Sequence, residues 1–302
     1  MNRRDAALPW ISLIAVYLVW GSTYLGIRLA VATIPPYLMT GIRYLIAGGL
    51  LFALQWTFAK GKVRLPDREG WIQLTITAVL LIVIGNGMLC VVETRVESAT
   101  AALIIATTPI WMLLIDAFIA RKVPSLWAIC GVALGTAGVA VLVGKGSGHL
   151  NALYAGLLVA GSISWAAGSV YARGKDHGPL TPSLEMLAGG VVSTIVALAL
   201  GEGSTLKPAS VAPSSVWGMI WLITAGAMLG YSAFAYAVRT LPTATVATYA
   251  YVNPIVAVVL GALLLREPVT WNIAIGGAAV VISVVLILLG NREAATELTV
   301  NG

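Results

Sequence analysis

The chain has 302 residues, of which 59% are hydrophobic and 10% charged, and its mean hydropathy is +0.93. Soluble domains carry about 25% charged residues, so this chain lacks the polar surface that a soluble enzyme of its length needs. The net charge of +6 does not indicate nucleic-acid binding, because no basic run is interleaved with stacking aromatic residues.

Ten segments are apolar and long enough to cross a bilayer as helices, which takes about 20 residues each. In chain order they are 10–31, 36–57, 71–92, 97–120, 124–144, 151–172, 180–200, 214–239, 243–265 and 268–290. The longest connections are 58–70 and 201–213, and the tail after Asn291 is too short to fold. We therefore predict an all-α integral membrane protein with ten transmembrane helices and no soluble domain.

The distribution of Lys and Arg predicts the orientation. Arg3 and Arg4 precede the first apolar run, but the run is long and has no small-x-small cleavage site, so we expect a retained helix. With the N-terminus in the cytoplasm, twelve Lys and Arg residues lie on the cytoplasmic side, five lie outside and Arg43 lies within a span. The positive-inside rule then places both termini in the cytoplasm and the chain in the cell (inner) membrane. Cys90 and Cys130 both lie in apolar stretches and are expected to be packed thiols rather than a disulfide.

The two halves of the chain repeat each other. At an offset of 147, residues 21–24 (Gly-Ser-Thr-Tyr) align with residues 168–171 (Gly-Ser-Val-Tyr). At an offset of 145, Gly85, Pro109 and Arg121 align with Gly230, Pro254 and Arg266. Each half has five spans, an odd number, so the second copy must cross the membrane in the opposite sense. We predict two inverted five-helix repeats, residues 1–145 and 146–302, with a site near the midplane where they meet.

The pattern resembles the EamA family of the drug/metabolite transporter superfamily over residues 10 to 290. The residues that carry the resemblance are Trp20-Gly21-Ser22, Ala244-Thr245, Asn253-Pro254 and Leu265-Arg266-Glu267-Pro268. The first half departs from the pattern, because Arg121-Lys122 stands where the second half has Arg266-Glu267. The resemblance implies a ten-helix exporter of amino acids and related metabolites.

Two prolines stand near the middle of their spans, at matching positions of the repeats. A proline inside a helix frees a backbone carbonyl, which in hydrocarbon must find a partner or line a wet cavity. Pro109 and Pro254 are therefore candidate hinges, although each alone is equally an ordinary kink whose carbonyl is satisfied by Thr108 or Asn253.

Tryptophan positions separate membrane-interface anchors from candidate site residues. Six tryptophans sit near span ends, where aromatic belts are expected, whereas Trp20, Trp111 and Trp165 sit much deeper. Any one of these deep tryptophans alone is most simply a packing residue. However, a tryptophan N–H or tyrosine O–H that faced lipid at this depth would lack a hydrogen-bond partner, so these groups should point into the bundle. We therefore expect a cavity with an aromatic wall.

Arg43 lies seven residues into its span, where a charge is expensive unless it snorkels. It is either a receptor for a carboxylate or the structural partner of Glu93 or Glu97. Asn86 is either a substrate contact or a hydrogen-bonding link between helices. The candidate substrate-binding residues are Trp20, Tyr24, Arg43, Asn86, Thr108, Trp111, Trp165, Tyr231, Tyr249 and Asn253, and the candidate hinges are Pro109 and Pro254.

These residues favour a carrier over an intramembrane enzyme. His149 and His177 lie in loops, Asp116 has no second intramembrane aspartate, and Ser22 and Ser169 lack a nearby base. We therefore expect no enzyme activity, no metal and no cofactor, and a monomer whose partners are the bilayer and a small molecule. The expected function is export of amphipathic metabolites, foremost amino acids with large apolar or aromatic side chains. The alternatives are a broad drug/metabolite or nucleotide-sugar carrier and a channel.

Overall fold

The structure is a computed structural model that describes residues 3–58, 65–121, 125–143, 152–173, 175, 178–241 and 249–300. The regular elements of these residues are all helical. They are α1 (Arg3–Ala30), α2 (Pro36–Phe58), α3 (Arg68–Ala78), η1 (Val79–Asn86), α4 (Gly87–Glu93), α5 (Ser98–Ile105), α6 (Thr108–Ala120), α7 (Leu126–Val143), α8 (Ala152–Ala172), α9 (Thr181–Ala199), α10 (Glu202–Thr205), η2 (Pro208–Ser210), α11 (Pro213–Trp221), η3 (Leu222–Leu229), α12 (Gly230–Thr240), α14 (Tyr249–Leu264) and α15 (Trp271–Val300).

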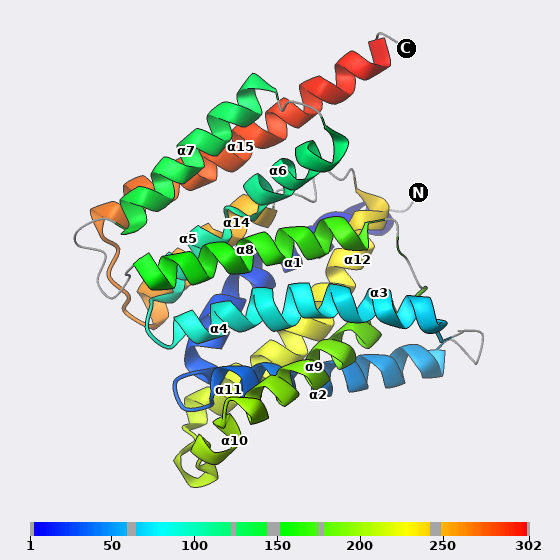
Figure 1. Cartoon of the computed structure of the whole chain (residues 1–302), viewed down its shortest axis with the longest axis vertical. Coiled ribbons are helices and arrows are strands. Elements are labelled where there is room, and N and C mark those ends of the chain that lie inside the picture. The colour runs from blue at the N-terminus through cyan, green and yellow to red at the C-terminus, as the bar shows by residue number, and fades with distance from the viewer. Residues whose placement is uncertain are drawn as a thin grey trace.

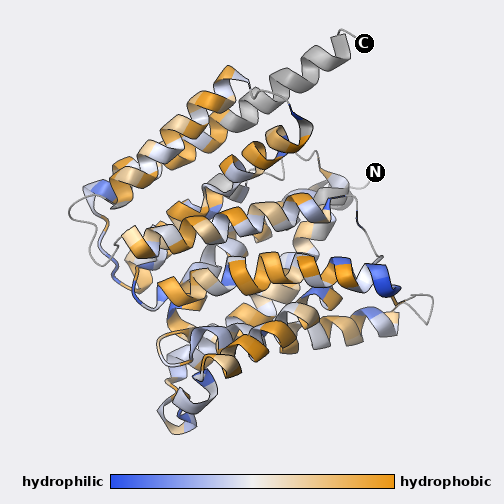
Figure 2. Ribbon diagram, viewed as in Figure 1, coloured by the Kyte–Doolittle hydropathy of each residue, from blue (hydrophilic) through white to orange (hydrophobic). Residues whose placement is uncertain are grey.

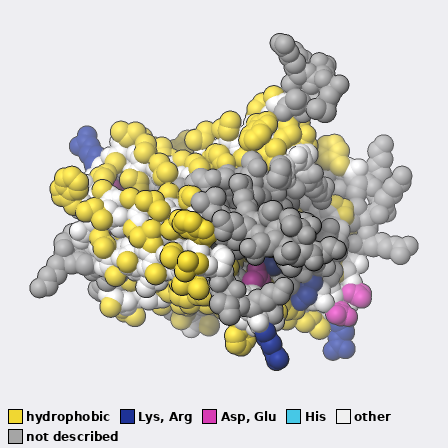
Figure 3. All heavy atoms as spheres, turned by 90° about the horizontal axis from the view of Figure 1, so that it is seen from above, with side chains coloured by type: hydrophobic (Ala, Val, Ile, Leu, Met, Phe, Trp, Pro, Cys, Tyr) yellow, Lys and Arg dark blue, Asp and Glu magenta, His cyan; other side chains and the backbone are white. Residues whose placement is uncertain are grey.

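Among the described residues, seven helices are long and apolar enough to cross a membrane, and α7, α14 and α15 contribute shorter apolar stretches. Hydrophobic residues run along the helices and hydrophilic ones gather at helix ends (Figure 2). Seen from above, apolar side chains make up much of the described surface, with a few charged side chains among them and at its edges (Figure 3). The apolar exterior is what a lipid environment requires, and the prediction of ten membrane helices is confirmed.

Successive spans run in opposite directions along the bundle (Figure 1). Both chain termini lie at one end of the bundle, which we call the terminal end. The turns 31–35 and 94–97 and the short helix α10 lie at the other end, which we call the opposite end. Helices α7 and α15 form one edge of the molecule, and α2 and α9 pack together at another.

The contacts between helices follow the repeat. Helix α1 packs on α14 and on η3, while its counterpart α8 packs on α6 and on η1. The π-helical segments η1 and η3 occur in corresponding spans. Arg121 and Arg266, aligned at an offset of 145, are the two non-glycine residues with positive φ in the described chain, at 50° and 56°. The structure thus pairs the two halves element by element.

Several predicted elements need correction. The fourth span is broken at Ala106 and Thr107, so it consists of α5 and α6. The tail after Asn291 is not too short to fold, because α15 continues to Val300; an α-helix satisfies its own backbone hydrogen bonds and can extend beyond the apolar stretch. The third and eighth spans each contain a π-helical segment that periodicity did not reveal. Ala244-Thr245, Lys122, His149 and His177 lie outside the described residues.

Glycines let α7 and α15 approach closely. A Cβ added to Gly138 would lie 2.9 Å from the carbonyl oxygen of Gly276, and one added to Gly135 would lie 2.8 Å from Oγ of Ser283. This is small-residue packing of the kind common between membrane helices. Cys90 is buried and Cys130 is exposed, and both are free thiols. The expectation that Cys130 is packed was therefore wrong, because its side chain lies on the exposed face of α7.

Candidate functional site

A cavity of about 160 Å³ lies inside the bundle, between spans of the two repeats. A single water needs about 10–15 Å³ by this measure, so the cavity has room for several waters or a small solute. It is lined by Trp20, Thr23, Tyr24, Ile27, Arg43, Tyr44, Gly85, Asn86, Leu89, Ile105, Thr108, Pro109, Met112, Gly161, Trp165, Gly226, Tyr231, Tyr249, Asn253 and Pro254. All of the candidate binding and hinge residues are among them except Trp111, whose Nε1 donates to Oγ1 of Thr107 at 3.3 Å.

The aromatic side chains form one connected wall. The centroid of the Trp20 ring lies 5.7 Å from that of Tyr231 and 5.4 Å from that of Tyr249, and both pairs meet edge to face. The centroid of the Phe234 ring lies 5.0 Å from that of Trp20. Phe234 and Tyr249 also meet edge to face at 5.8 Å. Such edge-to-face contacts are worth about 0.5–1.5 kcal/mol each beyond area burial, so the wall is held in shape by its own packing.

Arg43 is 4% exposed, and its Nε and Nη1 have no hydrogen-bond partner among the described residues. Its guanidinium lies over the Tyr44 ring, with Cζ 4.7 Å from the ring centroid. The ion pair expected with Glu93 or Glu97 is not formed; within the described chain the ion pair found is that of Asp116 with Arg173. A buried cation with free donors, facing a cavity, is suited to receiving an anionic group.

Two asparagines contribute amide groups near the cavity. Asn86 ends η1, is 9% exposed, and its Oδ1 accepts a hydrogen bond from Sγ of Cys90 at 3.5 Å. The Asn253 amide is oriented so that its NH₂ group, and not its oxygen, faces the neighbouring carbonyl groups. Its side-chain nitrogen then donates to the carbonyl oxygens of Tyr17 at 3.2 Å and Tyr249 at 3.3 Å. Asn253 therefore links α14 to α1, whereas Asn86 keeps its NH₂ group available.

The two prolines play different local roles. Pro109 lies in the first turn of α6, where the chain leaves α5, and Oγ1 of Thr108 donates to the carbonyl oxygen of Ile105 at 2.6 Å. That carbonyl is the one that a residue with an N–H at position 109 would have bonded, so Thr108 satisfies it. Pro254 lies inside the continuous helix α14. The expectation of two prolines inside two helices is thus correct for Pro254 and wrong for Pro109, which starts a new helix.

Each π-helical segment accepts a bond from the other repeat. Nε1 of Trp20 donates to the carbonyl oxygen of Gly226 in η3 at 3.2 Å, and Oγ of Ser164 donates to that of Leu80 in η1 at 2.8 Å. A Cβ on Gly230 would lie 2.3 Å from Nε1 of Trp20.

Trp165 occupies the corresponding place in the other repeat. A Cβ on Gly85 would lie 3.2 Å from Cε3 of Trp165. Trp20 and Trp165 are 145 residues apart, as are Gly85 and Gly230. By this packing, each against a glycine of the other half, the two deep tryptophans correspond at an offset of 145, which differs by two residues from the offset that aligns residues 21–24 with 168–171.

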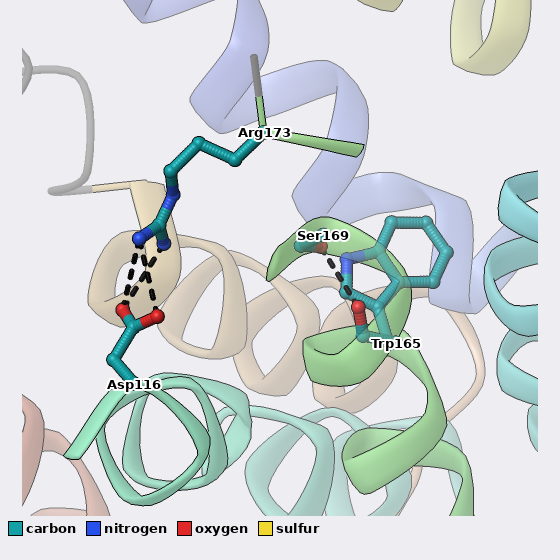
Figure 4. A network of polar contacts seen from close by, with 4 residues as sticks. All are labelled: Asp116, Trp165, Ser169 and Arg173. Atoms are coloured by element: carbon teal, nitrogen blue, oxygen red, sulfur yellow. Dashed lines mark hydrogen bonds and ion pairs between the residues drawn. The ribbon is translucent and has the colours of Figure 1, made fainter. Parts of the chain in front are cut away.

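Beyond the cavity, the terminal end carries an ion pair. Arg173, at the end of α8, donates hydrogen bonds to the carboxylate of Asp116 in α6, and its Nη1 and Nη2 each lie 3.1 Å from Oδ2 (Figure 4). One turn along α8, Oγ of Ser169 donates to the carbonyl oxygen of Trp165 at 2.8 Å. The side chains of Arg173 and Asp116 are 59% and 40% exposed, so this pair contributes little to stability.

Sequence reasoning missed several contributors to the site. Phe234 completes the aromatic wall, and its spacing of three residues from Tyr231 on the same helix face was an available signal. Tyr44 underlies Arg43, and Gly226 is approached by both Trp20 and Arg43. A glycine whose carbonyl matters has no side-chain signature, so Gly226 could not have been found from its residue type. The six tryptophans expected at span ends, Trp10, Trp56, Trp71, Trp127, Trp217 and Trp271, are all exposed.

Known proteins resemble this chain over nearly its whole length. The EamA-like transporter family matches residues 8–144 and 152–289. The uncharacterized inner membrane transporter YedA of Escherichia coli K12 is 37% identical over 283 residues, which are 92% of this chain and 90% of YedA. A protein of Salmonella typhimurium named "Probable amino-acid metabolite efflux pump" is 23% identical over 94% of both chains. A solved crystal structure shares the fold, with a TM-score of 0.65, 18% identity, and coverage of 93% of this chain and 97% of that chain.

Proposed function

The chain belongs to the EamA-like transporter family, and from that membership we propose that it exports small amphipathic metabolites, foremost amino acids with large apolar or aromatic side chains, by alternating access. It is a membrane transporter and not an enzyme, and its substrate is a small molecule. The proposal places it in the inner membrane with both termini cytoplasmic, moving substrate outward. Each five-helix half, residues 1–145 and 146–302, acts as one repeat.

One observation supports the choice of substrate. The buried guanidinium of Arg43, two of whose nitrogens have no partner among the described residues, and the aromatic wall around Trp20 meet at Gly226 of η3. A Cβ on Gly226 would lie 3.5 Å from Nη2 of Arg43, and the carbonyl oxygen of Gly226 accepts from Trp20. A substrate carboxylate would bind Arg43 while its apolar side chain packs on Trp20 and Tyr249. Two relatives bear the name "Probable amino-acid metabolite efflux pump", at 22% and 23% identity, which supports the same substrate class.

The alternatives differ in the charge that they require. A nucleotide-sugar would need several cations for its phosphates, and Arg43 is the charged residue among those described as lining the cavity. A broad drug carrier would not depend on Arg43 for neutral or cationic compounds. A channel would show no counterflow, because counterflow requires a saturable site that alternates between the two sides.

The test is counterflow of Phe, Trp and Met into liposomes holding the purified protein, with Trp20→Ala and Asn253→Ala as site variants. Trp217→Ala is the matched control, because Trp217 is 69% exposed and does not line the cavity. We expect counterflow by wild type and by Trp217→Ala, and a strong loss in both site variants. Cells carrying wild type should also resist toxic aromatic amino-acid analogues better than cells carrying Trp20→Ala.

The outcomes separate the parts of the proposal. Absence of both counterflow and protection with wild type overturns the amino-acid substrate. Unchanged counterflow in both site variants leaves the exporter class intact and overturns the site.

A further inference from the structure

Glu93, the last residue of α4, is 0% exposed, and neither oxygen of its carboxyl group has a hydrogen-bond partner in the part of the chain that the structure describes. The guanidinium of Arg28 donates to the backbone carbonyl oxygen of Glu93 and not to its side chain. Glu93 does not line the cavity, but Leu89, one helical turn before it, does. A buried carboxyl group without a partner is therefore present beside the cavity, toward the opposite end.

Charged and titratable groups from three other elements lie within electrostatic range of this carboxyl group. They are Tyr24 and Arg28 from α1, Arg43 from α2, and Glu267 from the segment after α14. On its own helix, Cys90 lies one turn before Glu93. Helices α5 and α8, which also pack on α4, contain no charged residue.

In this arrangement the carboxyl group must carry its proton. An ionised carboxylate with no partner in the membrane interior is far more costly than a neutral acid, because nothing replaces its hydration. Neither Arg28 nor Arg43 forms an ion pair with it in the described chain.

Two contacts close the opposite end around Glu93. One is the bond from Arg28 to its carbonyl oxygen. The other is the Glu267 carboxylate, which accepts from the backbone nitrogens of Ser98 at 2.9 Å and Ala99 at 3.1 Å, and from Oγ of Ser98 at 2.9 Å. An opening that moved α1 and the end of α14 away from α4 and α5 would have to break both contacts. Water would then reach Glu93, and Arg28 would be released to pair with its carboxylate.

We propose that Glu93 is a proton-binding site that controls the opposite end of the bundle. A proton on the carboxyl group lets this end close, and the ionised carboxylate holds it open. On closing, an O–H bond forms on the carboxylate with a proton taken from the adjoining water; on opening, that proton returns to the same water. Because protons bind the closed state better, they shift the equilibrium toward it. The inference rests on the proposed function, in which this end faces outside, so that external pH sets how readily the emptied carrier closes.

Cys90 is a native reporter of this opening. Its thiol is buried in the closed arrangement and lies on the same helix face as Glu93. In a Cys130→Ser background, a membrane-impermeant thiol reagent added outside intact cells reaches Cys90 only when the opposite end is open. Dividing each labelling rate by that of a free model thiol at the same pH removes the titration of the thiol itself.

The parent protein should label faster as external pH rises, by up to about tenfold per pH unit, which is the limit for one titrating proton. Glu93→Gln, which mimics the protonated acid, should label slowly with a flat profile, and Glu93→Asp should keep a slope. Glu185→Gln is the matched control, because Glu185 is another carboxylic acid within a span, on α9. It should behave like the parent.

A flat profile in the parent overturns the proposal whether or not any variant folds. A parental slope that persists in Glu93→Gln, or disappears in Glu185→Gln, also overturns it. Counterflow measured with the same parent protein distinguishes failure of this proposal from failure of the proposed function. A labelling rate that does not change with pH, together with intact counterflow, overturns only the proton site at Glu93. Loss of counterflow overturns the proposed function.

Discussion

Arg43 is the residue whose replacement should discriminate most sharply between ligands. Its guanidinium is buried, faces the cavity and has two nitrogens without partners. A hydrogen bond to a charged group contributes about 1.5–3 kcal/mol, so Arg43→Gln should weaken binding of phenylalanine about 10- to 100-fold. Binding of the corresponding amine without a carboxylate should change little. Competition for counterflow by the two ligands measures both effects.

The matched control for that prediction is Arg173→Gln. Arg173 is also an arginine of the bundle, but it pairs with Asp116 at the exposed terminal end. Its loss should leave both ligands unaffected, because exposed ion pairs contribute roughly 0–1 kcal/mol. An equal loss for the acid and the amine in Arg43→Gln would contradict a carboxylate at this residue.

Gly230 tests the close packing behind the aromatic wall. A Cβ at this position would lie 2.3 Å from Nε1 of Trp20, so Gly230→Ala must displace the indole or the helix. Overpacking of this kind costs about 1–3 kcal/mol and should also impair transport, because Trp20 leaves the cavity wall. The thermal midpoint in detergent measures the first effect and counterflow the second.

Gly156→Ala is the control substitution for Gly230→Ala. Gly156 also lies in a helix, α8, but a Cβ there would meet nothing within 4 Å. Alanine is favoured over glycine in helices by about 1 kcal/mol, so stability should hold or rise. A drop in the thermal midpoint as large as that of Gly230→Ala would show that glycine's flexibility, and not the contact with Trp20, is what matters.

At the scale of the helices, the two prolines should differ in their effect on turnover. Pro254 interrupts the hydrogen bonds inside the continuous helix α14, whereas Pro109 starts α6 after a break at Ala106 and Thr107. Pro254→Ala restores a bond in mid-helix and stiffens it, so the counterflow rate should fall several-fold. Pro109→Ala leaves the break in place and should have a smaller effect. Equal rates for the two variants would mean that the proline in α14 is not a hinge.

The π-helical segments couple the two halves at the level of whole elements. Segment η1 accepts a bond from α8 and η3 accepts one from α1, so each half is bonded to the other at its irregular segment. Irregular helical turns of this kind occur often at functional sites. We expect α1 with η3, and α8 with η1, to move together in the proposed alternating access.

At the scale of the whole molecule, the orientation in the membrane is a prediction of the charge distribution. Reporter fusions after residues 65, 122 and 292 should indicate the cytoplasm, and a fusion after residue 147 should indicate the outside, because Lys and Arg concentrate on one side. An external signal at residue 292 would overturn both this topology and the side assigned to Glu93.

The membrane class, the ten spans and the repeat could be predicted from the amino-acid sequence alone. The spans follow from the demand of lipid for long apolar segments whose backbone hydrogen bonds are made internally. The repeat follows from residues such as Arg121 and Arg266, which occur in the same order in both halves. The same properties placed Trp20, Arg43, Asn86 and Asn253 at the depth where a site would lie, although the helix faces that they occupy could not be read.

Which polar groups meet depends on how the helices pack, and the sequence did not reveal it. In a membrane protein the lipid-facing and the core-facing residues are both apolar, so the sequence contains little information about how each helix is rotated. The structure therefore excluded Trp111 from the cavity, added Phe234 and Tyr44, and left Arg43 and Glu93 without the ion pair that their sequence positions allowed. The break before Pro109 and the two π-helical segments became visible only in the structure, because the apolar periodicity of these spans is that of a regular helix.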